Sequence, residues 1–219
     1  MEKLLLAVLL FAFLPEGMPQ KDLGGKVFIF PEQSDTAYVT LIPRVRKPLR
    51  SFTLCLKAFT DLTRTYSLFS YSTKSRDNEL RLFASKKGEY ELCIGNAKVV
   101  FKVPHLRHGP VHLCVSWESI SGIAELWVNS KPVGRKGLRK GYTLGGDAKI
   151  ILGQEQDSFG GSFHAKQSFV GEIWDVYLWD RVVSLKNFCP TCYNGNILNW
   201  RALTYQARGY VVVKPRLKA

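Results

Sequence analysis

Short stretches in which apolar and polar residues alternate recur along almost the whole chain. The period is two residues rather than 3.6, and clusters of glycine, proline, asparagine, aspartate and serine separate the stretches. Alternation of this kind predicts β-strands with one buried face. The predicted strands cover residues 26–30, 37–41, 52–58, 67–71, 79–83, 90–94, 99–103, 111–117, 123–128, 149–152, 170–178 and 210–213.

Many short strands divided by turn residues are typical of an antiparallel sandwich or jelly roll. Residues 117–127 read as a hairpin that turns through residues 119–122. Only residues 184–189 have a helical pattern, with Ser184 as a cap and Pro190 as the end of the helix. The chain has no repeat and no long linker, so we expect an all-β fold with one short helix and a single domain over residues 20–219.

The first nineteen residues have the pattern of a secretory signal peptide. Lys3 precedes an apolar run over residues 4–14, which is too short to span a bilayer. A buried core strand is the alternative interpretation. No later stretch has eighteen apolar residues in a row. We therefore expect removal of residues 1–19 and an exported, soluble mature protein without a transmembrane segment.

The chain is strongly basic. Its 31 lysines and arginines outnumber its 18 acidic residues, which gives a formal net charge of +13, and removal of residues 1–19 raises this to +14. A basic surface attracts phosphate-rich, sulphated or nucleic-acid polyanions in a salt-dependent way. A solvated surface with no specific site is the simpler alternative. The basic clusters are Arg44, Arg46 and Lys47, then Arg135, Lys136, Arg139 and Lys140, and finally Lys214, Arg216 and Lys218.

Oxygen-donor side chains gather in two polar segments that are far apart in the sequence. Ca²⁺ takes six to eight oxygen ligands, which one short loop rarely supplies. Two segments that converge from distant parts of the chain would supply enough ligands. By itself this pattern is also compatible with solvated loops. The candidate ligands are Asp77 and Asn78 in one segment, and Glu155, Gln156, Asp157 and Gln167 in the other.

Five cysteines are distributed along the chain. Cys55 and Cys114 both lie on the less apolar side of their predicted strands, as two neighbours bridging one sheet would. In an exported domain this favours a Cys55–Cys114 disulfide. Cys93, Cys189 and Cys192 remain. A redox or zinc role for the Cys189–Cys192 pair lacks the usual context, and a short-loop disulfide or pairing with a second chain stays open.

Residues 112–119 resemble the signature of the pentraxin family, His-x-Cys-x-Ser/Thr-Trp followed by a short polar pair. Further segments resemble pentraxin sequences in the same order, so that the likeness covers nearly the whole mature chain. These segments are residues 26–31, 66–71, 77–80, 121–125, 151–158 and 168–172. The resemblance implies a flattened, lectin-like β-jelly roll that assembles as a cyclic homopentamer, with two adjacent Ca²⁺ ions on one face of each subunit.

The family's calcium ligands match oxygen-donor residues of this chain. In that match the first ion is held by Asp77, Asn78, Glu155, Asp157 and the backbone carbonyl of Gln156, and the second by Glu155, Asp157 and Gln167. Two close cations need shared anionic ligands, and a phosphate or carboxylate oxygen of the bound molecule would complete their coordination.

Three positions beside the expected calcium pair determine the ligand preference that we predict. Phe83 matches the family's aromatic or apolar wall, with local strand packing as the alternative. Cys93 replaces a tyrosine and Lys98 replaces a glutamate that different members use at these places. We therefore predict calcium-dependent anion binding with little preference for choline.

The resemblance implies a secreted pattern-recognition protein of innate immunity, extracellular and with a mucosal surface as one setting. It would bind phosphorylated or carboxylated head groups and polyanions on microbes or cell debris. Two alternatives remain: a glycan-active jelly-roll enzyme, and a polyanion binder that works by charge alone with vestigial calcium loops. The enzyme alternative is weak because Glu172 and Asp175, three residues apart, are expected to face opposite sides of their strand.

Overall fold

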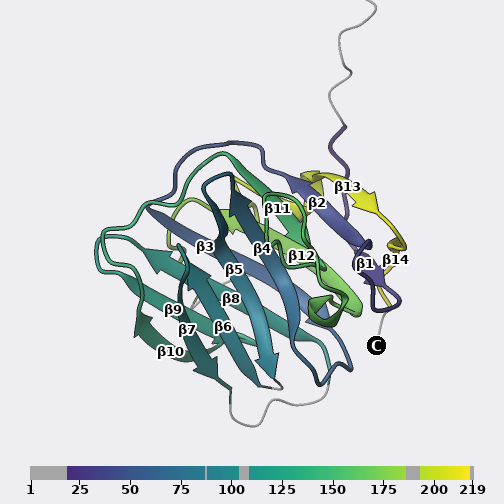
Figure 1. The fold of residues 1–219 in the computed structure, drawn as a ribbon, viewed down its shortest axis with the longest axis horizontal. Coiled ribbons are helices and arrows are strands. Elements are labelled where there is room, and N and C mark those ends of the chain that lie inside the picture. The colour runs from purple at the N-terminus through teal and green to yellow at the C-terminus, as the bar shows by residue number, and fades with distance from the viewer. Residues whose placement is uncertain (1–18, 87, 104–108, 186–192, 218–219) are drawn as a thin grey trace, which may run out of the picture.

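A computed structural model gives the fold and describes residues 19–86, 88–103, 109–185 and 193–217 (Figure 1). The predicted signal peptide lies outside these ranges except for its last residue. The predicted helix over residues 184–189 is also largely outside them, and Ser184 and Leu185 are not helical. The described helices are two three-residue 3-10 turns that the pattern did not predict, η1 (Ala165–Gln167) and η2 (Trp200–Ala202). Neither is long and apolar enough to cross a membrane.

The described residues form a two-layer, all-β fold. The first sheet has the strand order β10-β9-β8-β3-β12-β1-β14, and the second has the order β13-β2-β11-β4-β5-β6-β7. All of the pairings between neighbouring strands are antiparallel. The strands of the first sheet are β1 (Lys26–Phe30), β3 (Ser51–Phe59), β8 (Val111–Glu118), β9 (Ile123–Val128), β10 (Lys131–Gly137), β12 (Gly171–Trp179) and β14 (Val212–Pro215). Those of the second are β2 (Tyr38–Ile42), β4 (Tyr66–Thr73), β5 (Arg76–Lys86), β6 (Glu89–Ile94), β7 (Ala97–Lys102), β11 (Ala148–Leu152) and β13 (Thr204–Arg208).

Each predicted strand corresponds to an observed strand, and the predicted all-β jelly roll is confirmed. The hairpin through residues 119–122 is also confirmed, because Glu118 of β8 pairs with Ile123 of β9. The alternation pattern missed β10 and β13. Most residues of β10 are exposed, and β13 has no buried residue. Both strands lie at the edge of a sheet and pair with only one neighbouring strand through their backbones. Their formation therefore requires little alternation of apolar and polar residues.

The hydrophobic core lies between the two sheets, as expected for a β-sandwich. On β3 and β8 the alternate apolar residues from Phe52 to Leu56 and from Leu113 to Trp117 are fully buried, and Leu54 pairs with Val115 across the strands. From the second sheet, Leu80 and Leu82 of β5 complete the core. Arg81 and Phe83, which alternate with them on the regular part of β5, therefore lie on the outer face of the second sheet.

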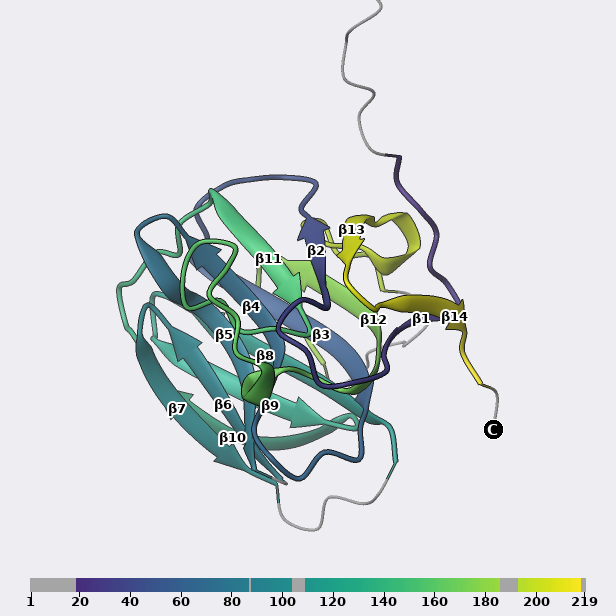
Figure 2. The same ribbon diagram turned by 45° about the vertical axis from the view of Figure 1, so that its right-hand side comes forward.

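Both sheets are also covered on their outer sides. The loop that follows β11 (green) crosses the outer side of the second sheet at β4 and β5 (Figure 2). On the first sheet, Thr53 Oγ1 donates to the carbonyl of Arg181 at 2.9 Å and accepts from the amide of Val183 at 3.0 Å. These covering segments explain why strand β3 has buried residues on both faces.

Candidate functional site

The loop after β11 carries most of the predicted calcium ligands, and its two ends are joined. The amide of Phe169 donates to the carbonyl of Gly153 at 2.9 Å. Gly153 has φ of +88°, and a Cβ atom there would lie 2.3 Å from the ring of Phe30, so this turn requires glycine. The side-chain amide of Gln154 then donates to the carbonyls of Ser34 and Ala37 at 2.6 and 3.0 Å. These contacts fix the loop on the second sheet.

Gln156 is fully buried, and its side chain holds the loop in place. Its Nε2 donates to Ser70 O and Lys149 O, both at 3.1 Å, and its Oε1 accepts from the amide of Gly160 at 2.9 Å. The side chain of Gln156 is therefore committed to the protein. Only its backbone carbonyl is available as a metal ligand, which is the atom that the resemblance assigns.

Three side-chain oxygens of this loop are buried without a hydrogen-bond partner among the described residues: Gln154 Oε1, Glu155 Oε2 and Gln167 Oε1. The last two belong to predicted calcium ligands. Glu155 is 1% exposed, and Gln167 ends the 3-10 turn η1. Buried polar atoms normally have partners, so an unpartnered carboxylate oxygen and amide oxygen call for an explanation such as an ion. The donor set therefore fits a hard cation.

Asp77 and Asn78 lie at the start of β5, on the sheet that the loop covers. Asp77 Oδ1 accepts from the amide of Asn78 at 2.9 Å, and the carbonyl of Asn78 accepts from the amide of Asn96 at 3.2 Å. The carbonyl oxygen of Asn78 also lies 3.8 Å from Cys93 Sγ, Cys93 pairs with Arg81, and Arg81 forms an ion pair with Glu155. The two predicted ligand segments are thus linked through the outer face of β5 and β6. Asp157 lies in the loop with Oδ2 3.3 Å from His164 Nε2.

The predicted ligand-pocket residues form a compact patch next to this loop. Cys93 of β6 pairs with Arg81 of β5 on one side and with Lys98 of β7 on the other. Phe83 lies in the adjacent row, opposite Glu91. The patch is therefore a two-row arrangement on the outer face of β5, β6 and β7.

Burial distinguishes the members of this patch. Phe83 is 7% exposed and Cys93 is 3% exposed, whereas the side chain of Lys98 is 63% exposed. Burial raises the pKa of the Cys93 thiol, so that it stays protonated at neutral pH. Cys93 is a free cysteine, and its Sγ lies 3.8 Å from the carbonyl oxygen of Asn78. Cys189 and Cys192 lie outside the described residues.

The sequence analysis did not identify Arg81 and Glu91, the two charged residues at the centre of the patch. The guanidinium of Arg81 forms ion pairs with Glu155 and with Glu91, and Lys98 Nζ lies 3.1 Å from Glu91 Oε2. The Cζ atom of Arg81 also lies 4.9 Å from the centre of the Phe83 ring. The alternation of β5 could have shown that Arg81 shares a face with Phe83, because the two positions are two residues apart on a regular part of the strand.

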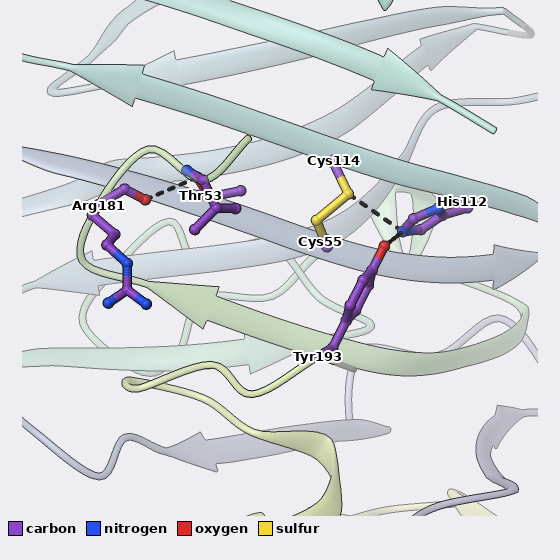
Figure 3. Close-up of a disulfide and its surroundings, with 7 residues drawn as sticks. Thr53, Cys55, His112, Cys114, Arg181 and Tyr193 are labelled. Carbon is purple, nitrogen blue, oxygen red and sulfur yellow. Dashed lines mark hydrogen bonds between the residues drawn. A yellow bond between two sulfur atoms is a disulfide. The ribbon is translucent and has the colours of Figure 1, made fainter. Parts of the chain in front are cut away.

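The predicted disulfide between Cys55 and Cys114 is confirmed (Figure 3). The two residues face each other across β3 and β8. His112 Nε2 lies 3.3 Å from Cys114 Sγ and 3.3 Å from the hydroxyl oxygen of Tyr193. The two sulfurs and this imidazole lie within 4.8 Å of one another, close enough to share a metal ion, but the sulfurs are bonded to each other and supply no thiolate.

Comparison with known proteins shows the family to which the chain belongs. The family model described as the Pentaxin family matches residues 26–215. The chain belongs to the pentraxin family. Mucosal pentraxin of Bos taurus is 84% identical to this chain over 217 residues, which cover 99% of this chain and 100% of the relative. Serum amyloid P-component of Sus scrofa is 52% identical over 223 residues, 99% of each chain.

A solved structure supports the fold independently of close sequence similarity. The native heptameric SAP-like pentraxin from Limulus polyphemus matches this chain with a TM-score of 0.77 at 22% identity, over 88% of this chain and 95% of that one. Pentraxins are binding proteins, and this chain is accordingly a binding protein and not an enzyme.

The carboxylates considered for a glycan-active enzyme have a different arrangement from the one predicted. A β-bulge between Trp174 and Tyr177 interrupts β12, and Asp175 lies at φ +51°. Simple alternation, which predicted opposite faces for Glu172 and Asp175, does not apply across a bulge. Asp175 Oδ2 instead accepts a hydrogen bond from Lys57 Nζ at 2.8 Å. This carboxylate is therefore part of an ion pair in the first sheet.

Proposed function

We propose that this pentraxin is a secreted, calcium-dependent binding protein that recognises phosphorylated or carboxylated head groups. The observation that carries the proposal is the pair of buried oxygens, Glu155 Oε2 and Gln167 Oε1, which have no hydrogen-bond partner among the described residues. They belong to the loop that lies over the second sheet, and Asp77 lies at the start of strand β5 of that sheet. Oxygen donors of this kind, in this number, suit Ca²⁺.

Two ions per subunit fit the donors that the chain provides. Asp77, Asn78, Glu155, Asp157 and the carbonyl of Gln156 would hold the first, and Glu155, Asp157 and Gln167 would hold the second. Glu155 and Asp157 would serve both ions as shared ligands. When bound, calcium would offer open coordination positions to a phosphate or carboxylate oxygen. The chain's own residues would then determine which group is accepted beside that oxygen.

The surroundings of the site favour anions over a choline head. Lys98 replaces an acidic residue that could attract a quaternary ammonium, and Cys93 replaces a second aromatic wall. The basic surface adds a non-specific attraction to polyanions such as nucleic acid or microbial surfaces. We further propose a signal peptide over residues 1–19, a pentraxin domain over residues 20–219 and assembly as a homopentamer, with microbes or cell debris at mucosal surfaces as targets in innate immunity.

Calorimetry on the mature protein tests the calcium site directly. We expect saturable Ca²⁺ binding that a Glu155→Gln/Asp157→Asn double variant loses. Asp147→Asn, which removes an exposed carboxylate outside the site, should bind Ca²⁺ as the unmodified chain does. The absence of Ca²⁺ binding by the unmodified chain would overturn the proposal.

Capture on phosphoethanolamine- and phosphocholine-coated resin separates calcium from charge. Binding through calcium is abolished by EDTA and persists at about 0.3 M salt, because the anion is a direct ligand. Binding by charge alone survives EDTA and is lost in salt. The second result would support the alternative in which the calcium loops are vestigial.

A further inference from the structure

The patch beside the proposed calcium site already contains a cation that belongs to the chain. Arg81 of β5 is mostly buried, with 14% of its side chain exposed. It makes ion pairs with Glu155 of the loop and Glu91 of β6. One guanidinium therefore joins a proposed calcium ligand to the floor of the ligand patch.

Arg81 also covers the aromatic side chain that was expected to contact a ligand. Its Cζ atom lies 4.9 Å from the ring centre of Phe83, within the roughly 6 Å range of a cation–π contact. A quaternary ammonium group seeks the same surface, an aromatic face next to a carboxylate. In this chain Arg81 occupies that face, and Glu91 is paired with Arg81 and Lys98.

The charges of the patch favour an anion once a metal takes Glu155. Arg81 and Lys98 then face only Glu91, which leaves one positive charge in excess among the three side chains. The Nε–H group of Arg81 is buried and has no hydrogen-bond partner among the described residues. A guanidinium donates to phosphate and carboxylate oxygens in a fixed geometry, so this donor suits a second oxygen of an anionic group.

We propose that Arg81 is the specificity-determining residue of the site and selects phosphate monoesters and carboxylates that lack an ammonium group. The inference rests on the proposed calcium-dependent function. Arg81 holds Glu155 in the calcium-free chain, takes the place that a ligand's ammonium would occupy, and offers an N–H donor to the anion. Lys98 adds charge at the exposed rim of the patch, where its ion pair is with Glu91 and not with Glu155.

Three variants of the full mature chain test this role: Arg81→Leu, Arg81→Lys and Lys98→Met. The first removes the charge and keeps a strand side chain, the second keeps the charge, and the third removes a charge that is not joined to Glu155. Titration calorimetry in saturating Ca²⁺ compares glycerol phosphate, a monoester without ammonium, with phosphocholine. Thermal unfolding in EDTA and in Ca²⁺ gives a readout that needs no ligand.

We expect the unmodified chain to bind glycerol phosphate more tightly than phosphocholine. Arg81→Leu should shift the ratio of the two affinities at least tenfold toward phosphocholine, whereas Arg81→Lys should shift it less and Lys98→Met by less than about threefold. The gain in melting temperature on addition of Ca²⁺ should be larger in Arg81→Leu than in the unmodified chain, because Glu155 has lost its internal partner.

Two results would overturn the inference, and they are distinguishable. If Ca²⁺ raises the melting temperatures of the unmodified chain and Arg81→Leu equally and the affinity ratio is unchanged, Arg81 has no selective role although the calcium function stands. If Ca²⁺ alters neither melting temperature and neither ligand binds, the proposed function fails, and the role of Arg81 fails with it.

Discussion

Tyr142 donates its hydroxyl hydrogen to Glu79 Oε2 at 2.7 Å, and this bond joins the loop after β10 to the strand that carries Asp77. The other oxygen of Glu79 accepts from the amide of Gly145 at 2.6 Å. Glu79 is only 2% exposed, so its carboxylate depends on these partners. Burial and the bond to Glu79 raise the pKa of Tyr142 to about 12, which keeps the phenol protonated at neutral pH.

We predict that Tyr142→Phe lowers the free energy of unfolding by about 1–3 kcal/mol, because a buried carboxylate oxygen loses its donor. Urea unfolding at pH 7 without calcium measures the change. Tyr210→Phe is the matched control, since Tyr210 is 57% exposed and should tolerate the same change. Equal stability of the two variants would contradict the structural role of the Tyr142 hydroxyl.

Gln156→Leu should weaken calcium binding even though its side chain is not a proposed ligand. The variant keeps the backbone carbonyl but loses the hydrogen bonds to Ser70, Lys149 and Gly160. We expect at least a tenfold loss of Ca²⁺ affinity by calorimetry and a loss of stability of about 2–4 kcal/mol. Ser158→Ala, an exposed change in the same loop, serves as the control. Unchanged affinity in Gln156→Leu would mean that the loop keeps its shape without this side chain.

Removal of the disulfide should lower stability substantially. Cys55 and Cys114 are 59 residues apart, and closing a loop of this length stabilises by about 4 kcal/mol on the chain-entropy model. We predict a loss of this order in a Cys55→Ala/Cys114→Ala variant, measured by urea unfolding. Cys93→Ala, which removes a buried thiol but no cross-link, should cost clearly less. Similar losses in the two variants would show that burial and not the cross-link dominates.

His112 should make the fold less stable in mild acid. Burial, with a smaller contribution from Lys57, lowers the pKa of His112 to about 4 from the usual 6.5. The unfolded chain then binds a proton more readily than the folded chain, so stability is retained above pH 6.5 and falls as the pH drops from there toward 4. The lowered pKa of His112 reduces the free energy of unfolding by about 3 kcal/mol at most between neutral pH and pH 4.

Urea unfolding of the unmodified chain and of His112→Gln between pH 7 and pH 4 measures this dependence. Acidic residues also lose stabilising charge in this range, so the informative quantity is the difference between the two pH slopes. His112→Gln should have the smaller slope. Identical slopes in the two chains would exclude His112 as the group responsible.

The alternation of residues predicted the strands that contribute to the core, because burial of one face requires that pattern. It failed for β10, whose segment contains Pro132 and Gly134 and only one apolar residue, Val133. This strand forms through backbone pairing with β9, for which the side chains give no signal. The alternation pattern also did not predict the bulge at Asp175, since one inserted residue changes the face of a side chain without changing the composition.

The candidate ligands were identified from residue type and from resemblance, whereas their neighbours needed the fold. Glu155 and Arg81 are far apart in the sequence, and only the passage of the loop over β5 brings them together. The link between Glu91 and Lys98 likewise depends on the register of β6 and β7. The replacement of a glutamate by Lys98 was expected to disfavour choline, but the ion pair with Glu91 reduces the effect of the Lys98 charge. Arg81 therefore has the larger influence on ligand preference in our proposal.

The disulfide lies under a second layer of side chains. Cys55 and Cys114 are 0% and 3% exposed, and Leu185 and Tyr193 flank Cys114 from the covering segment of the first sheet. A thiol reagent can attack the bridge only after Leu185 and Tyr193 move away from Cys114. The rate of reduction under native conditions therefore reports how often this layer opens, separately from global unfolding. A disulfide covered in this way survives brief exposure to reductants.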